Sequence, residues 1–160
     1  MQIPIHIIDF LKSTSDISIG RNKINFFNAE ELEEKQAGYN FYLDGESISK
    51  DWAEELIVIG SDQVGDPIIV DTEESELTVF TAVREKDGWE LYDIADSLEN
   101  LKNIISRLQE ISANRNTPIE LEKKPISNEE RESILAEIGR QNSSISIWYW
   151  SNLLEMCKEI

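Results

Sequence analysis

Two residues belong to the types that most often carry catalysis: the single histidine, His6, and the single cysteine, Cys157. A histidine acts as a general base or a zinc ligand only with partners placed around it, such as a nucleophile or further ligands. The chain has no second histidine and no basic cluster near Cys157 that would activate its thiol. We therefore expect structural roles for both residues, and we predict no catalytic residue, no metal site and no cofactor.

The segment 60–73, GSDQVGDPIIVDTE, contains turn residues that invite two ligand-binding interpretations. Its two glycines have the spacing of a phosphate-binding loop, but Asp66 and Pro67 occupy the positions of the lysine and the hydroxyl residue. A calcium loop counted from Asp62 has Val64 and Pro67 where an oxygen ligand and the turn glycine belong. The residues at these positions therefore argue against both a phosphate site and a calcium site.

Negative charge is the strongest compositional signal. The 160 residues include 32 acidic and 15 basic ones, giving a net charge of −17, and residues 61–112 hold 13 of the acids. This surface would repel nucleic acid and anionic membranes, and it favours a basic protein partner. Neighbouring acids such as Glu73 and Glu74 could suggest glycoside hydrolysis, but with so many acids chance pairs are expected. We predict that acids of this middle third contact the partner: Asp62, Glu73, Glu74, Glu76, Glu85 and Asp87.

An aromatic cluster, Trp148, Tyr149 and Trp150, ends the alternating segment SISIWYW. We interpret this segment as a strand, in which Trp148 and Trp150 share one face and Tyr149 lies on the other. Large aromatic side chains are more often buried than displayed, yet Trp and Tyr also dominate the energetics of protein interfaces. Trp148 and Trp150 therefore join the predicted partner-binding residues.

The elements that must position these residues begin with a short helix in HIIDFLK, at residues 6–12. A second helix is predicted to start at Asn28, with Glu31 in the capping-box position and Gly38 as its end. The periodicity of residues 39–56 is weak, so their state stays open. The apolar runs LIVIG and PIIVD, at residues 56–60 and 67–71, predict two strands around a tight loop.

Residues 77–94 alternate like a hairpin whose turn contains Asp87 and Gly88. A helix follows, with Asp96 as the expected cap and Glu99 three residues later. Its apolar stripe has spacings of three and four residues, and it consists of Leu98, Leu101, Ile104, Ile105, Leu108 and Ile111.

Beyond a connection at residues 112–125, Ser127 and Glu130 form another capping box for a helix that ends near Gly139. The aromatic segment would then be a strand, and a terminal helix would start at Ser151. We predict one α+β domain over residues 1–160, with a central unit at about 56–110 and an extension at 113–160 that covers one side of it.

The central unit resembles the SMI1/KNR4 family, also called the SUKH superfamily. The shared pattern is a strand ending in Ile-Gly, a turn with Gly and Asp, a strand ending in Asp, and an IA-x-S-[FL] entry to a helix. The matching positions are Ile59, Gly60, Asp62, Gly65, Asp66, Asp71, Ile94, Ala95, Ser97, Leu98 and Leu101. The resemblance covers about a third of the chain.

This resemblance implies a central antiparallel, or mixed, β-sheet covered by helices. It also implies a non-enzymatic role, which in bacteria is that of an immunity protein that neutralises a polymorphic toxin, often a nuclease. Gly60, Gly65, Asp66 and Asp71 are then structural motif residues, because glycines permit turn backbones and aspartates accept hydrogen bonds from loop amides.

Two rival functions remain at this stage: an intracellular hub or regulatory domain of cell-wall or stress signalling without a toxin partner, and a carboxylate-based hydrolase. We predict a cytoplasmic protein, because the opening residues lack the pattern of a signal peptide and no stretch is apolar enough to cross a membrane. The oligomeric state stays open.

Overall fold

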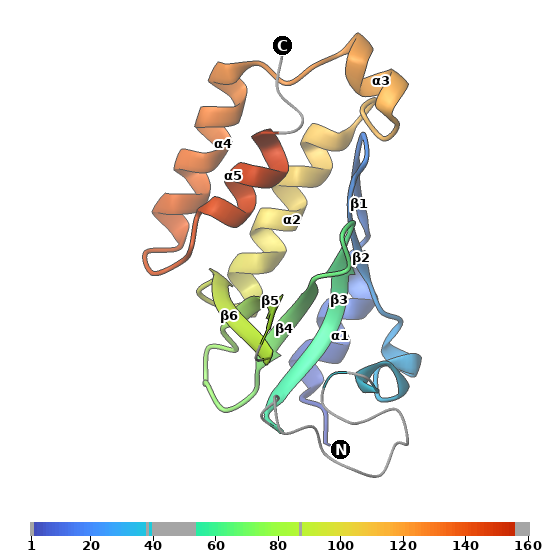
Figure 1. Cartoon of the computed structure of the whole chain (residues 1–160), viewed down its shortest axis with the longest axis vertical. Coiled ribbons are helices and arrows are strands. Elements are labelled where there is room, and N and C mark those ends of the chain that lie inside the picture. Colours follow the sequence, from blue (N-terminus) through green and yellow to red (C-terminus); the bar gives the residue numbers. More distant parts are fainter. Residues whose placement is uncertain (1, 38, 40–53, 87, 156–160) are drawn as a thin grey trace.

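The computed structural model describes residues 2–37, 39, 54–86 and 88–155. Within them, six strands form one antiparallel sheet in the order β1-β2-β3-β4-β5-β6, so that each strand pairs with its neighbours in sequence (Figure 1). The strands are β1 (Ile17–Ile19), β2 (Asn22–Phe26), β3 (Leu56–Asp62), β4 (Pro67–Asp71), β5 (Val79–Glu85) and β6 (Gly88–Ala95). The helices are α1 (Ile5–Ser13), α2 (Leu98–Ser112), α3 (Pro118–Lys123), α4 (Asn128–Gln141) and α5 (Trp148–Glu155). The predicted α+β class with an antiparallel sheet is confirmed.

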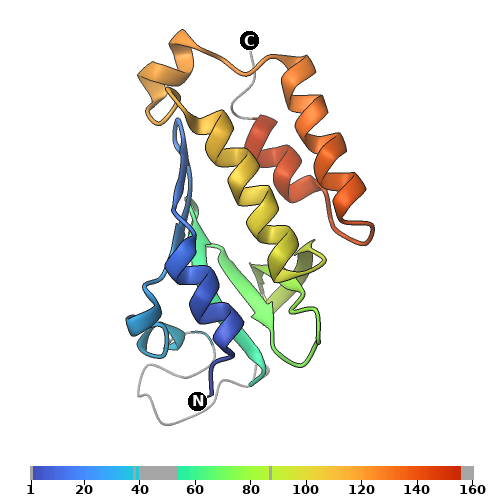
Figure 2. The ribbon, with the colours of Figure 1, turned by 180° about the vertical axis from the view of Figure 1, so that it is seen from behind.

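The helices α1 and α2 lie on the same face of the sheet, as Figure 2 shows from behind. The main core gathers buried side chains from this face together with those of α1, α2, α4 and α5. A smaller cluster, formed by Leu56, Val58, Ile69 and Ala82, lies on the other face. Both faces of β3 and β4 therefore carry buried side chains, which explains why their sequences are almost continuously apolar.

The predicted stripe of α2 is confirmed, since all six of its apolar residues are buried. The cap is one residue later than expected: the hydroxyl of Ser97, not the carboxylate of Asp96, accepts a hydrogen bond from the main-chain N–H of Asn100. The predicted cap at Ser127 is confirmed, because its hydroxyl accepts from the N–H of Glu130. This helix, α4, runs to Gln141 rather than ending near Gly139.

Three predictions of local structure were wrong. The segment after Asn28 forms two short 3-10 turns, η1 (Ala29–Glu31) and η2 (Glu34–Gln36), and the side chain of Asn28 makes no cap. Gly38 lies outside the described residues. In addition, the connection at 112–125 contains the short helix α3, which begins after Thr117.

The third error concerns the aromatic segment, which is helical rather than a strand. Helix α5 starts at Trp148, three residues earlier than predicted, and it buries Tyr149, Trp150, Leu153 and Leu154. These positions follow the spacing of three and four residues of a helix face. The alternation of serine and isoleucine before Trp148 is too short to outweigh that longer helical pattern.

Candidate functional site

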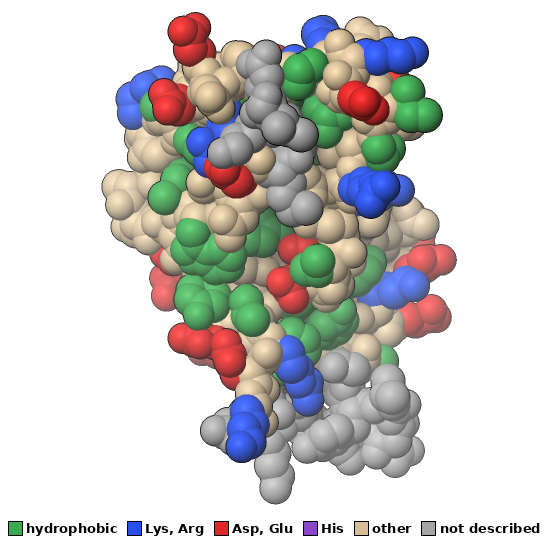
Figure 3. Space-filling view, turned by 45° about the horizontal axis from the view of Figure 1, so that its top comes forward, with side chains coloured by type: hydrophobic (Ala, Val, Ile, Leu, Met, Phe, Trp, Pro, Cys, Tyr) green, Lys and Arg blue, Asp and Glu red, His purple; other side chains and the backbone are tan. Residues whose placement is uncertain are grey.

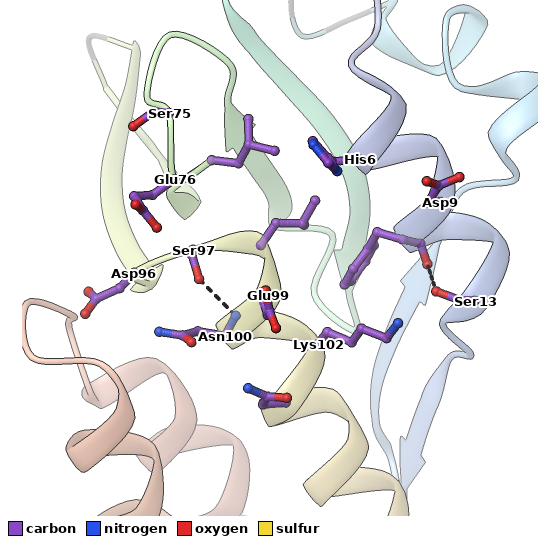
Figure 4. A pocket seen from close by; sticks show the side chains of 14 residues that line it. His6, Asp9, Ser13, Ser75, Glu76, Asp96, Ser97, Glu99, Asn100 and Lys102 are labelled. Carbon is purple, nitrogen blue, oxygen red and sulfur yellow. Dashed lines mark hydrogen bonds between the residues drawn. The ribbon is translucent and has the colours of Figure 1, made fainter.

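A groove of about 1030 Å³ lies between α1, the start of α2 and the loop that joins β4 to β5 (Figure 4). Its lining residues are His6, Asp9, Phe10 and Ser13 of α1; Ser75, Glu76 and Leu77 of the loop; and Asp96, Ser97, Leu98, Glu99, Asn100, Lys102 and Asn103 around the start of α2. The chain segments involved are far apart in sequence, and the sheet brings them together by placing β4, β5 and β6 side by side.

The β4–β5 loop, residues 72–78, is held in a defined shape. Its ends are fixed by hydrogen bonds from the N–H of Asp71 to the carbonyl of Thr78 and from the N–H of Thr72 to the carbonyl of Glu55. Leu77 adopts a left-handed conformation with φ of 56°, which a branched residue rarely does, and its side chain packs against the main core. This partly buried anchor places the neighbouring Glu76 at the groove.

The start of α2 is fixed by contacts with the end of α4 and the residues after it. The carboxylate of Asp96 accepts a hydrogen bond from the N–H of Ser143, and the N–H of Asp96 donates to the side chain of Asn142. The amide of Asn100 donates to the carbonyl of Gln141. These contacts hold the α2 wall of the groove in place.

The groove is acidic. Asp9, Glu76 and Glu99 are exposed, and within the described parts of the chain their carboxylates accept no hydrogen bond and form no ion pair. Asp96 adds a fourth acid, and Lys102 is the one lysine or arginine that lines the groove. Figure 4 shows His6, Glu76 and Glu99 on three different walls. The arrangement favours a positively charged group between these walls.

The groove does not assemble a catalytic pair. His6 is exposed, and no hydrogen bond joins it to an acid or a serine among the residues that the structure describes. The hydroxyl of Ser97 is occupied as the cap of α2, and that of Ser13 donates to the carbonyl of Phe10. Across the same described residues, no group of three or more His, Cys, Asp or Glu side chains could hold a metal ion. Cys157 lies outside them.

Asp62, a predicted partner-binding residue, has a different position: its side chain is turned inward at the β3–β4 turn. The residue is only 8% exposed. Its Oδ1 accepts from the N–H groups of Val64 and Asp66, both at 3.0 Å, and its Oδ2 accepts from the hydroxyl of Tyr149 at 3.1 Å. The prediction that Asp62 binds a partner was therefore wrong, because its carboxylate is buried and accepts three hydrogen bonds from groups inside the protein.

The carboxylate of Asp62 affects the groups around it. Burial, and secondly the charge of Asp62, raise the pKa of the Asp66 side chain. Burial also raises the pKa of the Tyr149 hydroxyl well above its ordinary value, with the charge of Asp62 as the next cause. Tyr149 is therefore a neutral hydrogen-bond donor that joins α5 to the β3–β4 turn.

The motif glycines have two different structural roles. Gly65 sits in the β3–β4 turn with φ of +88°, as a turn glycine is expected to. Gly60 lies within β3, where an added Cβ would come within 2.3 Å of the carbonyl oxygen of Asn25 on β2. Its role is therefore a close approach of two strands and not a turn. Asp71 acts as predicted, since its carboxylate accepts from the N–H of Glu73.

The two tryptophans of the aromatic segment differ in their exposure to solvent. Trp150 has no exposed surface, and its indole N–H donates to the carbonyl of Ile94 at 2.8 Å, so including it among the partner-binding residues was wrong. Trp148 is 38% exposed and Ile147 is 39% exposed. The ring of Trp148 meets the ring of Tyr92 edge to face, with centroids 5.2 Å apart. In Figure 3, hydrophobic side chains gather left of centre with acidic side chains below them.

The other predicted acids are exposed. Glu73, Glu74 and Glu76 belong to the β4–β5 loop and Glu85 to the end of β5, while Asp87 lies outside the described residues. Of this set, the structure brings only Glu76 to the groove. Sequence reasoning missed the other groove acids, Asp9, Asp96 and Glu99. It treated Asp96 and Glu99 as capping residues only, and nothing in the sequence places α1 against the start of α2.

Comparisons of the chain with protein-family models, with curated proteins and with solved structures find no match. Among the described residues, every helix is too short or too polar to span a bilayer.

Proposed function

We propose that this chain is a non-enzymatic binding protein that recognises a basic protein partner. In its specific form, the proposal is an immunity protein of the SMI1/KNR4 type that neutralises a toxin domain, such as a nuclease, in the cytoplasm of the cell that makes both. The resemblance of residues 56–110 to that family supports the specific form. The acidic groove supports the general one.

The observation that carries the proposal is the state of the groove carboxylates. Asp9, Glu76 and Glu99 have no partner among the described residues, and the main chain that carries Glu76 and Glu99 is held by the anchor at Leu77 and the cap of α2. Such carboxylates can accept charge-assisted hydrogen bonds from the lysine or arginine side chains of a partner without first giving up a donor inside the protein. A nuclease toxin must carry such cations to hold its phosphate substrate.

The net charge of −17 adds long-range attraction to this local fit. Opposite charges steer two proteins together and can raise association rates well above the ~10⁵–10⁶ M⁻¹s⁻¹ of uncharged pairs. Exposed charges are screened beyond a Debye length of about 8 Å at physiological ionic strength. We therefore expect the association rate with the partner to fall steeply as salt is added.

Co-expression tests the proposal directly. Each toxin domain encoded next to this chain is expressed with and without it, and the outcomes measured are growth and the recovery of a stoichiometric complex. We expect the intact chain to restore growth and to co-purify with one of these toxins.

Charge reversal then locates the contact. The groove variant carries Glu76→Lys and Glu99→Lys, and the control variant carries Glu122→Lys on α3 and Glu132→Lys on α4, which changes the net charge equally. Glu122 and Glu132 are exposed and line no part of the groove. We expect the groove variant to associate at least about tenfold more slowly, and the control to change the rate by about threefold or less. Equal losses in both variants would contradict a contact at the groove.

Failure of rescue with every neighbouring toxin candidate would favour an intracellular hub or regulatory domain without a toxin partner. Turnover of a glycoside or another small substrate by the purified chain, lost on changing groove carboxylates to amides, would overturn the non-enzymatic assignment.

A further inference from the structure

The last strand of the sheet, β6, has an open edge that the acidic groove does not involve. It pairs with β5 on one side, and the two-residue loop between Glu85 and Gly88 sets the register. The residues that flank such a loop form a hydrogen-bonded pair, and the pairs then alternate along the hairpin. Leu91 lies opposite Ala82 in a non-hydrogen-bonded pair. Its main-chain N–H and carbonyl therefore point away from β5.

The same alternation applies two residues further along β6, at Asp93. The carbonyl of Asp93 also points outward, and there it accepts a hydrogen bond from the N–H of Ser146 at 2.8 Å. This contact closes the end of the edge near Ala95. No corresponding hydrogen bond from any described residue reaches the main chain of Leu91, and its side chain is 40% exposed. Among the residues that the structure describes, the edge is thus occupied at Asp93 and unoccupied at Leu91.

The two faces that border this open edge differ in chemistry. On one face, Glu85 and Glu90 stand beside Tyr92, and a hydrogen bond to Glu90 and the charges of both acids raise the pKa of the Tyr92 hydroxyl. The partly exposed ring of Trp148 meets the ring of Tyr92 edge to face. On the other face, the exposed Leu91 lies along β6 between Trp89 and Asp93 and opposite the buried Ala82. A strand added beside β6 would meet carboxylates and aromatic rings on one face, and on the other a mixed surface in which Leu91 lies between an aromatic ring and a carboxylate.

Two occupants can add a strand to such an edge: a second copy of this chain or a segment of another protein. A second copy would bring the two sets of Glu85 and Glu90 together, in a molecule whose net charge is already −17. Like charges across paired strands destabilise the pairing. The charge of this face therefore fits a basic partner and opposes self-association.

We propose that the open edge of β6 at Leu91 binds an extended basic segment of the partner protein as a seventh strand. The lysine or arginine side chains of that segment lie on the face of Glu85 and Glu90, and its apolar side chains lie on the face of Leu91. The proposal rests on the proposed function for the charge of the partner, but it assigns a second contact surface, separate from the groove.

The test uses a probe peptide of eight residues in which lysine and valine alternate, with both ends blocked. It is titrated into the full chain labelled with ¹⁵N, and amide hydrogen exchange and chemical shifts are followed by NMR. The outward N–H of Leu91 is expected to exchange quickly in the free protein and to become protected in the complex. This readout needs no variant.

Two variants at one position separate main-chain pairing from simple charge attraction. Leu91→Pro removes the outward N–H without removing a bond to β5, and proline is tolerated at such edge positions. Leu91→Thr also replaces leucine by a smaller side chain, but it retains the main-chain N–H. We expect Leu91→Pro to weaken peptide binding at least about tenfold, and Leu91→Thr to weaken it by about threefold or less. If Leu91→Pro does not fold, Glu90→Lys replaces it, with Glu122→Lys as the control of equal charge, and the same tenfold difference is expected.

Equal binding by the two Leu91 variants, or peptide-induced shifts confined to the groove around Glu76 and Glu99, would overturn the edge proposal and leave the proposed function standing. A dimer that forms without peptide and is lost in Leu91→Pro would assign the edge to a second copy and also overturn it. No binding of the peptide would overturn it as well, whereas rescue from a toxin separately decides the proposed function.

Discussion

Asp62 of the β3–β4 turn and the acids of the groove are all carboxylates, but their surroundings are opposite. Asp62 is buried and surrounded by donors, two from the main chain and one from Tyr149. Glu76 and Glu99 are exposed, and no described residue donates to them. Asp62 therefore stabilises the turn, whereas the exposed groove carboxylates have no such internal role among the described residues.

The difference shows that net charge alone does not locate a binding surface in this protein. The buried Asp62 carboxylate keeps its charge, but its oxygens already accept three internal hydrogen bonds and cannot be reached by an external cation without breaking them. The proposed contact with a partner therefore involves the carboxylates that are exposed and have no donor among the described residues. The two groups can be separated experimentally, because changes at the turn should affect stability and changes at the groove should affect association.

The largest effect is expected from Asp62→Ala. The substitution leaves the buried hydroxyl of Tyr149 and two part-buried main-chain N–H groups without their acceptor, which should lower the free energy of unfolding by about 2–4 kcal/mol. Urea unfolding followed by tryptophan fluorescence measures this change. Glu76→Ala is the matched control, and it should alter stability by about 0.5 kcal/mol or less. Comparable losses for both variants would break the distinction between turn and groove.

Tyr149→Phe sharpens the comparison by removing a single donor. The ring still fills its place in α5, but the Oδ2 of Asp62 loses its 3.1 Å hydrogen bond in a buried position. A hydrogen bond to a charged group contributes about 1.5–3 kcal/mol, so we expect a loss of that size in the free energy of unfolding. Tyr92→Phe serves as the control, because the hydroxyl of Tyr92 lies at the surface beside Glu90 and its removal should leave the free energy of unfolding nearly unchanged. If Tyr149→Phe left the free energy of unfolding unchanged, the hydrogen bond from α5 to Asp62 would not contribute to stability.

The parts of this fold that local patterns determine could be predicted from the sequence. The stripe of α2, the cap at Ser127, the two apolar strands and the hairpin all depend on residues close together in the chain, and the structure bears them out. The aromatic segment was assigned wrongly because the serine and isoleucine alternation before it resembles a strand. The helical spacing from Tyr149 to Leu154 decided its state, since that spacing allows four large side chains to reach one core.

The site was harder to predict, because it depends on contacts between distant segments. The acidity of residues 61–112 drew attention to Glu76, which lines the groove, but the same signal selected the buried Asp62, which accepts a hydrogen bond from a tyrosine 87 positions away in the chain. Asp9 could not be chosen, because no local pattern shows that α1 packs beside the start of α2. Charge density in the sequence therefore suggested a basic partner, which stays a prediction, whereas only the fold shows which acidic residues lie together at the groove.

The smallest effect is expected from Asp66→Asn, and it should depend on pH. Burial and the charge of Asp62 raise the folded-state pKa of Asp66 above its ordinary value of 3.8. A raised carboxyl pKa contributes stability that is complete below the unfolded value and is lost as the pH rises through the folded value. The asparagine variant does not titrate, so its stability relative to the natural chain should increase as the pH rises from 3 to 6. Because Asp66 remains partly exposed, solvent screening should limit the gain to about 0.5 kcal/mol. Urea unfolding of both proteins at pH 3 and pH 6 measures the gain, and a relative stability that falls with rising pH would mean that the ionised Asp66 carboxylate stabilises the turn as that of Asp62 does.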